Sequence, residues 1–348
     1  MDNVRAVFEV VKNDASLTKI ILLQGQAPPT WSIEGANVKF VQELSLQGVF
    51  YLARAKVYLM GTSLQGFTNF HALVGNKHKI IQLWHGVPLK RIGKLFPPET
   101  FWQVETGKYS ATVCSSPSDQ LFMQQAFAPL PLERVWQTGL PRNDFILAAD
   151  EQLPNDYRDE LERIRAKVNG RFLVLYAPTW RDSIENVYQF SKAEQSQLSA
   201  LLLEHNAVLA IRGHANVRSR VDYEDVSTLD NIIYVNDVPD ANLLLKEAGA
   251  LITDYSSIYI DFLITGRPVV YFTYDIDSYV NERGFLYELD EAFVCEPALT
   301  FDQLLIDIKR ALSEGVVDKN RYDRVKSLFH QHGADSGLSV ANNIKALL

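Results

Sequence analysis

The stretch Leu251-Ile-Thr-Asp-Tyr-Ser-Ser-Ile-Tyr-Ile-Asp-Phe-Leu-Ile-Thr-Gly-Arg-Pro-Val-Val-Tyr-Phe272 has the pattern of a buried strand, a polar turn, a short helix and a second buried strand. The apolar run 250–253 is bounded by polar residues, as in a strand that is covered on both faces. Asp254 and Ser256 are residue types that favour the start of a helix, and Gly266 favours its end. The stretch therefore predicts a strand-turn-helix-strand unit of an α/β protein with a parallel sheet.

The start of this short helix is a candidate phosphate site. A helix that begins at Ser256 and Ser257 presents free backbone N–H groups, two hydroxyls and the positive end of its dipole, all of which suit a phosphate. Asp261 lies four residues beyond Ser257, on the same face of the helix. The alternative is that the two serines only cap the helix, and this stretch alone does not decide between the two interpretations.

The length of the chain predicts two domains. A chain of 348 residues exceeds one ordinary core and suits two domains of about 150 residues. We expect a Rossmann-like domain over residues 1–149 and a second over residues 150–348, with a linking helix at the boundary. Because the chain begins on a helix after Asn3 rather than on a strand, we expect the usual first strand of the first domain to be absent or supplied differently.

Composition and charge exclude several classes of protein. Lys and Arg total 34 against 42 Asp and Glu, and this net charge of −8 argues against broad nucleic-acid binding. Cys114 and Cys295 are too few for a disulfide framework or a cysteine zinc site, and they favour a reducing cytoplasm. No segment reads as a signal peptide or a membrane span. We expect a cytoplasmic protein with no nucleic-acid partner.

In the first half of the chain, a histidine follows a buried strand. Short apolar runs at 38–41, 57–59 and 80–84 predict strands of a parallel sheet. His85 and Gly86 come just past the last of these, at the carboxyl edge where ligands bind in open α/β sheets. Gly86 allows a ligand to approach the backbone, and Lys90 adds positive charge. His85 is a candidate acid, base or phosphate ligand; the alternative is a structural or solvated loop histidine.

The second half of the chain repeats this placement. The stretch that begins at Phe172 predicts a buried strand that ends in a proline turn, and this turn presents Thr179 and Arg181. Arg181 can bind a phosphate through two parallel hydrogen bonds, and the alternative is a surface ion pair with Asp182.

A second strand-end histidine, His214, follows the strand expected over 207–211. No pair of histidines has the spacing of a helical zinc motif, and no glycine-rich phosphate loop is present. We therefore expect no metal and no resident cofactor, and a phosphate site of another construction.

Four motifs at predicted strand ends now stand together. They are Trp84-His-Gly-Val-Pro-Leu-Lys90, Gly139-Leu-Pro-Arg-Asn-Asp144, Tyr176-Ala-Pro-Thr-Trp-Arg-Asp182, and Thr253-Asp-Tyr-Ser-Ser257 with Asp261. As a set they resemble the CDP-glycerol glycerophosphotransferases, the teichoic acid primases and polymerases, over most of the chain from Asp2-Asn3 to about Gly284. The resemblance implies a glycosyltransferase-B fold with the donor in the cleft between two Rossmann-like domains, the second of them binding the CDP donor. It also implies transfer of a polyol phosphate to an acceptor hydroxyl with loss of CMP.

The resemblance also implies roles for single residues. It makes His85 the general base and His214 a second essential histidine that contacts the transferring phosphate. Arg181, Ser256 and Ser257 become ligands of the donor phosphates, and Asp261 the acid that binds the ribose hydroxyls. The other donor-binding positions are Gly86, Thr179 and Asp254, and further cleft positions are Lys90, Arg142 and Asn143.

We therefore predict an enzyme that moves glycerol phosphate, or a related polyol phosphate, from a CDP-activated donor to a hydroxyl of a cell-surface polymer or its lipid-linked glycan precursor. Two alternatives stay open: a nucleotide-sugar glycosyltransferase or non-hydrolysing epimerase of the same fold, and a non-catalytic nucleotide-binding protein. A lipid-linked acceptor implies at most peripheral contact with the inner face of the cell membrane. The stretch we expect to touch lipid is the apolar loop around Pro28, Pro29 and Trp31.

Overall fold

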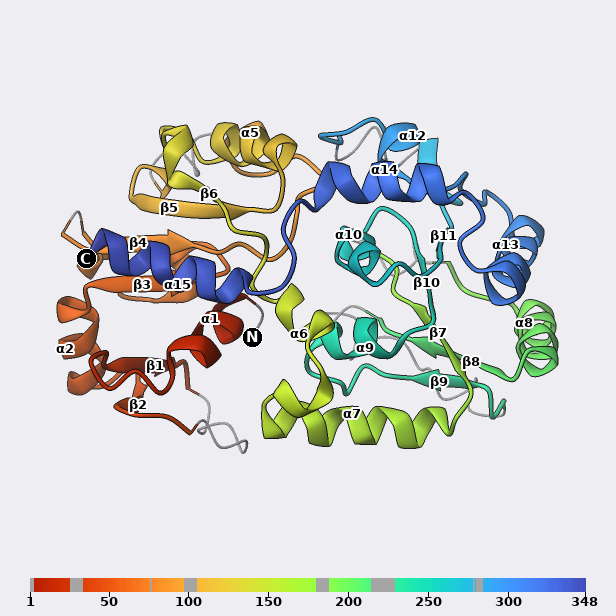
Figure 1. Cartoon of the computed structure of the whole chain (residues 1–348), viewed down its shortest axis with the longest axis horizontal. Helices are drawn as coiled ribbons and strands as arrows, with labels where there is room; N and C mark the ends of the chain where they lie inside the picture. Colours follow the sequence, from red (N-terminus) through yellow and green to blue (C-terminus); the bar gives the residue numbers. More distant parts are fainter. Residues whose placement is uncertain are drawn as a thin grey trace. The chain divides into compact units, whose positions relative to one another are not determined.

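The chain divides into two compact units. The computed structural model describes residues 3–25, 34–75, 77–96, 105–179, 188–213, 229–277, 279 and 284–348 (Figure 1). The first unit comprises Met1–Val87, Arg91–Asp156 and His330–Leu348, and the second comprises Pro88–Lys90 and Tyr157–Phe329. Each unit has its own sheet, and all the pairs of neighbouring strands are parallel. The predicted α/β class with parallel sheets is confirmed.

The first unit is built on a four-stranded sheet in the order β3-β4-β5-β6. Its strands are β3 (Val57–Met60), β4 (Lys79–Gln82), β5 (Tyr109–Cys114) and β6 (Val135–Gln137), and β1 (Lys19–Leu23) pairs separately with β2 (Val38–Gln42). The strand predicted over 80–84 corresponds to β4, and the prediction that it reaches Trp84 is wrong, because β4 ends at Gln82. Trp84 has φ +49, and this left-handed backbone takes the chain out of the extended conformation directly before His85.

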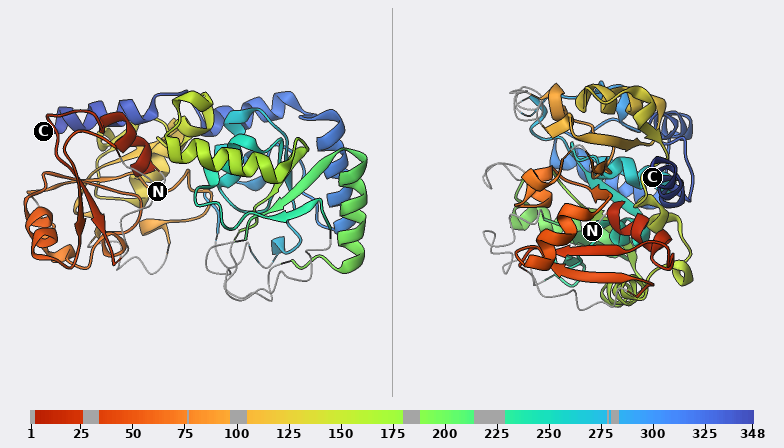
Figure 2. Two further views of the ribbon diagram at one scale, coloured as in Figure 1. Left: turned by 90° about the horizontal axis from the view of Figure 1, so that it is seen from below. Right: turned by 90° about the vertical axis from the view of Figure 1, so that its left-hand side faces the viewer.

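The helices of this unit include one from the end of the chain. They are α1 (Asn3–Val11), α2 (Leu46–Arg54), α3 (Leu64–Phe67), α5 (Pro117–Ala126), α6 (Asn143–Leu147) and α15 (Ser336–Leu347). Helix α15 lies beside α1, as the views in Figures 1 and 2 agree. Residues 330–348 therefore group with the first unit, which differs from the expected range 150–348 for the second domain. A local pattern holds no information about which distant helix a terminal helix packs on.

The second unit contains a five-stranded sheet in the order β11-β10-β7-β8-β9. The strands are β7 (Phe172–Tyr176), β8 (Ala207–Ile211), β9 (Ile232–Tyr234), β10 (Ala250–Thr253) and β11 (Val269–Tyr271). Strand β7 comes first in the chain and lies in the middle, with β8 on one side and β10 on the other. The strand order therefore reverses between β7 and β10, and ligands of such sheets bind outside the carboxyl ends of the strands at this switch point.

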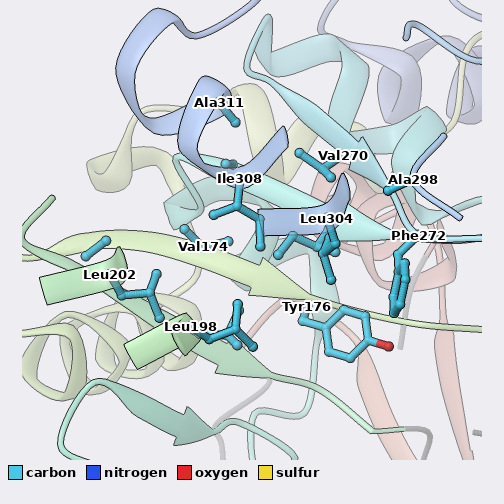
Figure 3. Packing of buried hydrophobic residues seen from close by; sticks show 14 of the residues in the cluster. Val174, Tyr176, Leu198, Leu202, Val270, Phe272, Ala298, Leu304, Ile308 and Ala311 are labelled. Atoms are coloured by element: carbon cyan, nitrogen blue, oxygen red, sulfur yellow. The ribbon is translucent and has the colours of Figure 1, made fainter. Parts of the chain in front are cut away.

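The core of the second unit shows how its helices hold the sheet. The helices are α7 (Asn155–Val168), α8 (Lys192–Glu204), α9 (Ala241–Glu247), α10 (Ile258–Phe262), α12 (Leu289–Ala292), α13 (Phe301–Glu314) and α14 (Lys319–Phe329). Leu304, Ile308 and Ala311 recur at helical spacing on α13 and belong to one buried cluster with Val174 and Phe272 of the sheet side (Figure 3). Replacing a side chain such as Leu304 by Ala costs about 2–5 kcal/mol. This layer fixes the strands whose carboxyl ends carry the candidate site.

Candidate active site

At the switch point of the second unit, the ends of β7 and β10 are tied together by two hydrogen bonds. The backbone N–H of Thr179 donates to Oδ1 of Asp254 at 2.8 Å. The hydroxyl of Thr253 donates to the carbonyl oxygen of Ala177 at 2.7 Å. Asp254 is only 1% exposed, so its carboxylate serves the turn after β7. Thr179 and Asp254, which lie 75 residues apart in sequence, are thus brought together.

The turn after β10 leaves a serine hydroxyl outside the helix cap. Helix α10 begins at Ile258, with Ser257 at the N-cap position, and the Ser257 side chain makes no capping hydrogen bond. The Ser256 hydroxyl oxygen accepts from the Ile258 N–H at a long 3.4 Å. The expectation that Asp254 or Ser256 is the N-cap is therefore wrong, and so, for Ser257, is the interpretation that the hydroxyl only caps the helix. The helix region ends at Gly266, with φ +72, as predicted.

An aromatic stack in the second unit joins two of the four motifs. The fully buried Tyr255, which precedes Ser256, stacks on Tyr279 with ring centroids 4.2 Å apart. The ammonium group of Lys90 lies 5.2 Å from the centre of the Tyr279 ring, a cation–π distance. Lys90 also forms an antiparallel bridge with Phe285. The motif that carries His85 therefore ends in the second unit against Tyr279. This contact could not be predicted from the sequence, because a single tyrosine has no pattern.

Three predicted positions have other outcomes. Asp261 lies on α10 and is 1% exposed, so its carboxylate is buried where the prediction needs it to meet a ribose. Arg181 and His214 lie outside the described residues, as does the loop around Pro28, Pro29 and Trp31. Their predicted roles stay predictions.

In the first unit, His85 has a defined ring orientation. Its Nδ1 lies 3.0 Å from the carbonyl oxygen of Gly61. A carbonyl oxygen can only accept, so Nδ1 carries the proton and the lone pair of the neutral ring is on Nε2. The ring stacks on Trp84, with centroids 4.3 Å apart and an interplanar angle of 27°. Gly86 follows with φ +139, a conformation that other residues rarely adopt. This geometry suits proton transfer at Nε2.

The motif 139–144 binds the start of the C-terminal helix α15 through Asp144. Asp144 accepts from the backbone N–H groups of Ser336 and Gly337, at 3.0 and 2.8 Å, at the start of α15. Burial raises the pKa of Asp144, and the two N–H donors act in the opposite direction. Arg142 is half-buried and Asn143 is 5% exposed. The described contacts of this motif are thus largely structural.

A buried acid in the first unit has no counterpart in the sequence predictions. Asp119 on α5 is 1% exposed, and its Oδ2 accepts from the Ser115 N–H at 2.9 Å. Within the described part of the chain its Oδ1 has no hydrogen-bond partner. Burial raises the pKa of Asp119 to about 7. In sequence it resembles any acid in a first helical turn, so only the structure identifies it.

Neither a metal cluster nor a membrane span is present among the described residues. No three or more of their His, Cys, Asp or Glu side chains are grouped so that they could hold a metal ion. None of their helices combines the length and the apolar composition that a membrane-spanning helix needs.

Comparisons with known proteins agree on one family. A family model described as CDP-Glycerol:Poly(glycerophosphate) glycerophosphotransferase matches residues 1–344. The chain is 28% identical over 313 residues to the teichoic acid glycerol-phosphate transferase of Staphylococcus aureus (strain NCTC 8325 / PS 47), covering 85% of this chain and 76% of that protein. It is 29% identical over 251 residues to the teichoic acid ribitol-phosphate polymerase TarK of the same strain, covering 68% of this chain but only 48% of that protein.

The fold has a counterpart among solved structures. The structure of the wall teichoic acid polymerase TagF matches with a TM-score of 0.81 and 22% identity. The match covers 99% of this chain and 85% of that one. At this identity the likeness shows a shared fold, and it agrees with the glycosyltransferase-B type that the four motifs imply.

Proposed function

The chain belongs to the CDP-glycerol:poly(glycerophosphate) glycerophosphotransferase family, and we propose that it transfers glycerol phosphate, or a related polyol phosphate, to a hydroxyl of a cell-surface polymer or of its lipid-linked precursor. The donor is CDP-activated and CMP is released. The observation that carries the proposal is the hydrogen bond between Thr179 and Asp254, which joins two family motifs at the switch point of the second unit. That switch point is where a sheet of this order binds its ligand.

On the donor side, we assign the pyrophosphate to the turn after β10. The hydroxyls of Ser256 and Ser257 and the backbone N–H groups at the start of α10 offer donors to an anion. Arg181 comes two residues after Thr179 and adds a positive group that can bind two phosphate oxygens. Asp254 does not bind the donor itself in this scheme: it holds the turn at Thr179. The ribose hydroxyls are assigned to Asp261 on the family resemblance alone, because its carboxylate is 1% exposed in the structure.

On the acceptor side, we assign His85 as the general base. The acceptor oxygen attacks the phosphorus that carries the glycerol, the bond from that phosphorus to the bridging oxygen breaks, and CMP leaves with the bridging oxygen. Nε2 of His85 takes the proton of the attacking hydroxyl, and His214 contacts the transferring phosphate. A positioned base contributes about 10²–10⁴-fold, and positioning and charge around the phosphate supply much of the remainder.

A surface of the first unit supports the proposal that the enzyme touches the membrane of its lipid-linked acceptor peripherally. Helix α2 exposes Leu46 (93%) and Phe50 (53%), and Leu44 just before it is 76% exposed. The guanidinium of Arg54 lies 5.3 Å from the centre of the Phe50 ring. Exposed apolar side chains beside cations are typical of a helix that lies on an anionic bilayer surface. This surface was not among the sequence predictions, which named the loop around Trp31.

Donor screening tests the proposed function. The purified chain is incubated with CDP-glycerol, CDP-ribitol and a UDP-sugar, each with and without a lipid-linked or polymer acceptor, and the released nucleotide is identified. Acceptor-dependent release of CMP supports the proposal. Release of UDP indicates the nucleotide-sugar alternative, and nucleotide binding without turnover indicates a non-catalytic protein. Because we propose that no metal is needed, loss of activity with a chelator and its recovery with Mg²⁺ contradicts that part.

A further inference from the structure

We infer that two buried carboxamides, Asn3 and Gln82, are positioning residues that hold His85 in its ring orientation. The inference rests on the proposed function only in naming His85 as the base; the geometry itself concerns the turn between β4 and His85. Asn3 and Gln82 are both 0% exposed. Neither residue can touch a substrate from such a place, so each must act through the groups it binds.

Asn3 binds the turn from helix α1. Its side-chain N–H groups donate to the carbonyl oxygens of Leu83 and Trp84, at 2.9 and 3.1 Å. Its side-chain oxygen accepts from the backbone N–H of Arg142 at 3.0 Å. Both donors of the amide are thus used, on partners about 80 residues away in sequence. One side chain therefore joins α1, the turn before His85 and the motif 139–144.

Gln82 binds the same turn from the other side. Its Oε1 accepts from the Trp84 N–H at 2.9 Å, and its Nε2 donates to the carbonyl oxygen of Thr62 at 2.8 Å. Thr62 directly follows Gly61, whose carbonyl oxygen receives the Nδ1 proton of His85. The Gln82 amide therefore joins the loop that carries His85 to the loop that orients its ring.

The turn needs such support because of the conformation of Trp84. A bulky residue at φ +49 is rare and persists only where its surroundings determine it. Both backbone polar groups of Trp84 are bound by these two side chains. The indole ring also stacks on the imidazole of His85. If either amide is lost, we expect Trp84 to relax toward extended backbone, moving the imidazole away from Gly61.

The test measures the His85 ring directly in the full chain. Asn3→Ala and Gln82→Met are prepared with ¹⁵N-labelled histidine, and the His85 signals are assigned with His85→Gln. The wild type is expected to show one tautomer, protonated at Nδ1, while both variants show a mixture. With CDP-glycerol and an acceptor, kcat should fall by about 10- to 100-fold with little change in KM for the donor.

A matched control separates positioning from general stability. Asn231 is another buried asparagine (2% exposed), which donates to the Ser199 carbonyl oxygen and accepts from the Ser199 hydroxyl, both at 2.8 Å, in the second unit. Asn231→Ala should lower the melting temperature like Asn3→Ala, yet leave the His85 tautomer and kcat unchanged.

The outcomes are separable. Folded Asn3→Ala and Gln82→Met proteins that keep the wild-type His85 signals would overturn the inference. If Asn3→Ala does not fold, Asn3→Ser, whose hydroxyl restores one donor, replaces it, and Gln82→Met is judged independently. If the ring signals change as expected but no protein releases CMP from any donor, the positioning role stands and the proposed function fails.

Discussion

Nδ1 of His85 and the carbonyl oxygen of Gly61 lie 3.0 Å apart, which fixes the proton on Nδ1 and leaves the lone pair of the neutral imidazole on Nε2. Through this one contact the imidazole has a defined orientation, as the proposed role of His85 as general base requires. This role gives the first prediction.

Replacing His85 by Gln should lower acceptor-dependent CMP release by about 10²–10⁴-fold while leaving CDP-glycerol affinity unchanged. Rates of CMP release and calorimetric titration with CDP-glycerol measure the two quantities. His71→Gln, an exposed histidine of the same unit, is the control and should behave like wild type. Near-normal release by His85→Gln would remove His85 from the mechanism.

Ser257→Ala should weaken CDP-glycerol binding by about one to two orders of magnitude, because it deletes a hydrogen bond to a charged phosphate worth ~1.5–3 kcal/mol. Its stability should change little, since the Ser257 hydroxyl makes no capping bond. Ser191→Ala is the converse control: Ser191 does cap α8, so that variant should lose about 1 kcal/mol of stability and keep full affinity. Calorimetric titration measures the CDP-glycerol affinity of both variants, and urea unfolding measures their stability. Unchanged affinity in Ser257→Ala places the phosphate elsewhere.

Asp261→Asn should weaken the binding of cytidine, CMP and CDP-glycerol alike, because the ribose is common to all three. Ser257→Ala, in contrast, should spare cytidine, which has no phosphate. The same titrations with the three ligands measure this. Because Asp261 is only 1% exposed, wild-type cytidine affinity in Asp261→Asn would mean that the carboxylate is a buried structural group and not a ribose ligand.

Asp119→Asn should stabilise the protein at alkaline pH. The pKa of Asp119 is raised to about 7 in the folded chain from 3.8, so between these values the folded state binds more protons than the unfolded state. Wild-type stability attributable to this group therefore falls as pH rises from about 4 to 7 and then levels off. The variant should match wild type near pH 4 and exceed it by up to a few kcal/mol at pH 8. Urea unfolding across this range tests it, and a difference that does not vary with pH would contradict the burial of a titrating carboxyl.

Leu46→Asp with Phe50→Asp should reduce co-sedimentation of the protein with vesicles that contain anionic lipid. Each apolar side chain contributes about 1.5–3 kcal/mol when fully buried, so the doubly substituted protein should partition at least tenfold less. The control is Leu203→Asp with Ile306→Asp, two exposed apolar positions of the second unit (69% and 57%). Equal loss in both pairs, or no loss in the first, would argue against α2 as the membrane surface.

Local sequence predicted the parts of the fold that depend on near neighbours. The strand over 207–211 has the predicted bounds, and a buried strand begins at Phe172 as predicted, because continuous apolar runs between turn residues specify buried strands. Gly266 ends the helix region as expected, because only its own backbone conformation matters there. The placement of His85 past a strand end also follows from the sequence alone, as does the family resemblance of the four motifs.

The partners of the polar side chains were decided by tertiary structure. Sequence placed Asp254 at a helix start, but the sheet order sets β10 beside β7, and the carboxylate binds the Thr179 N–H. Asn3 showed only that a helix begins there, yet folding brings its amide onto Leu83 and Trp84. A buried polar group must find a hydrogen-bond partner, and the partner that it finds depends on which distant strands and helices the fold makes neighbours. That information is absent from any local pattern.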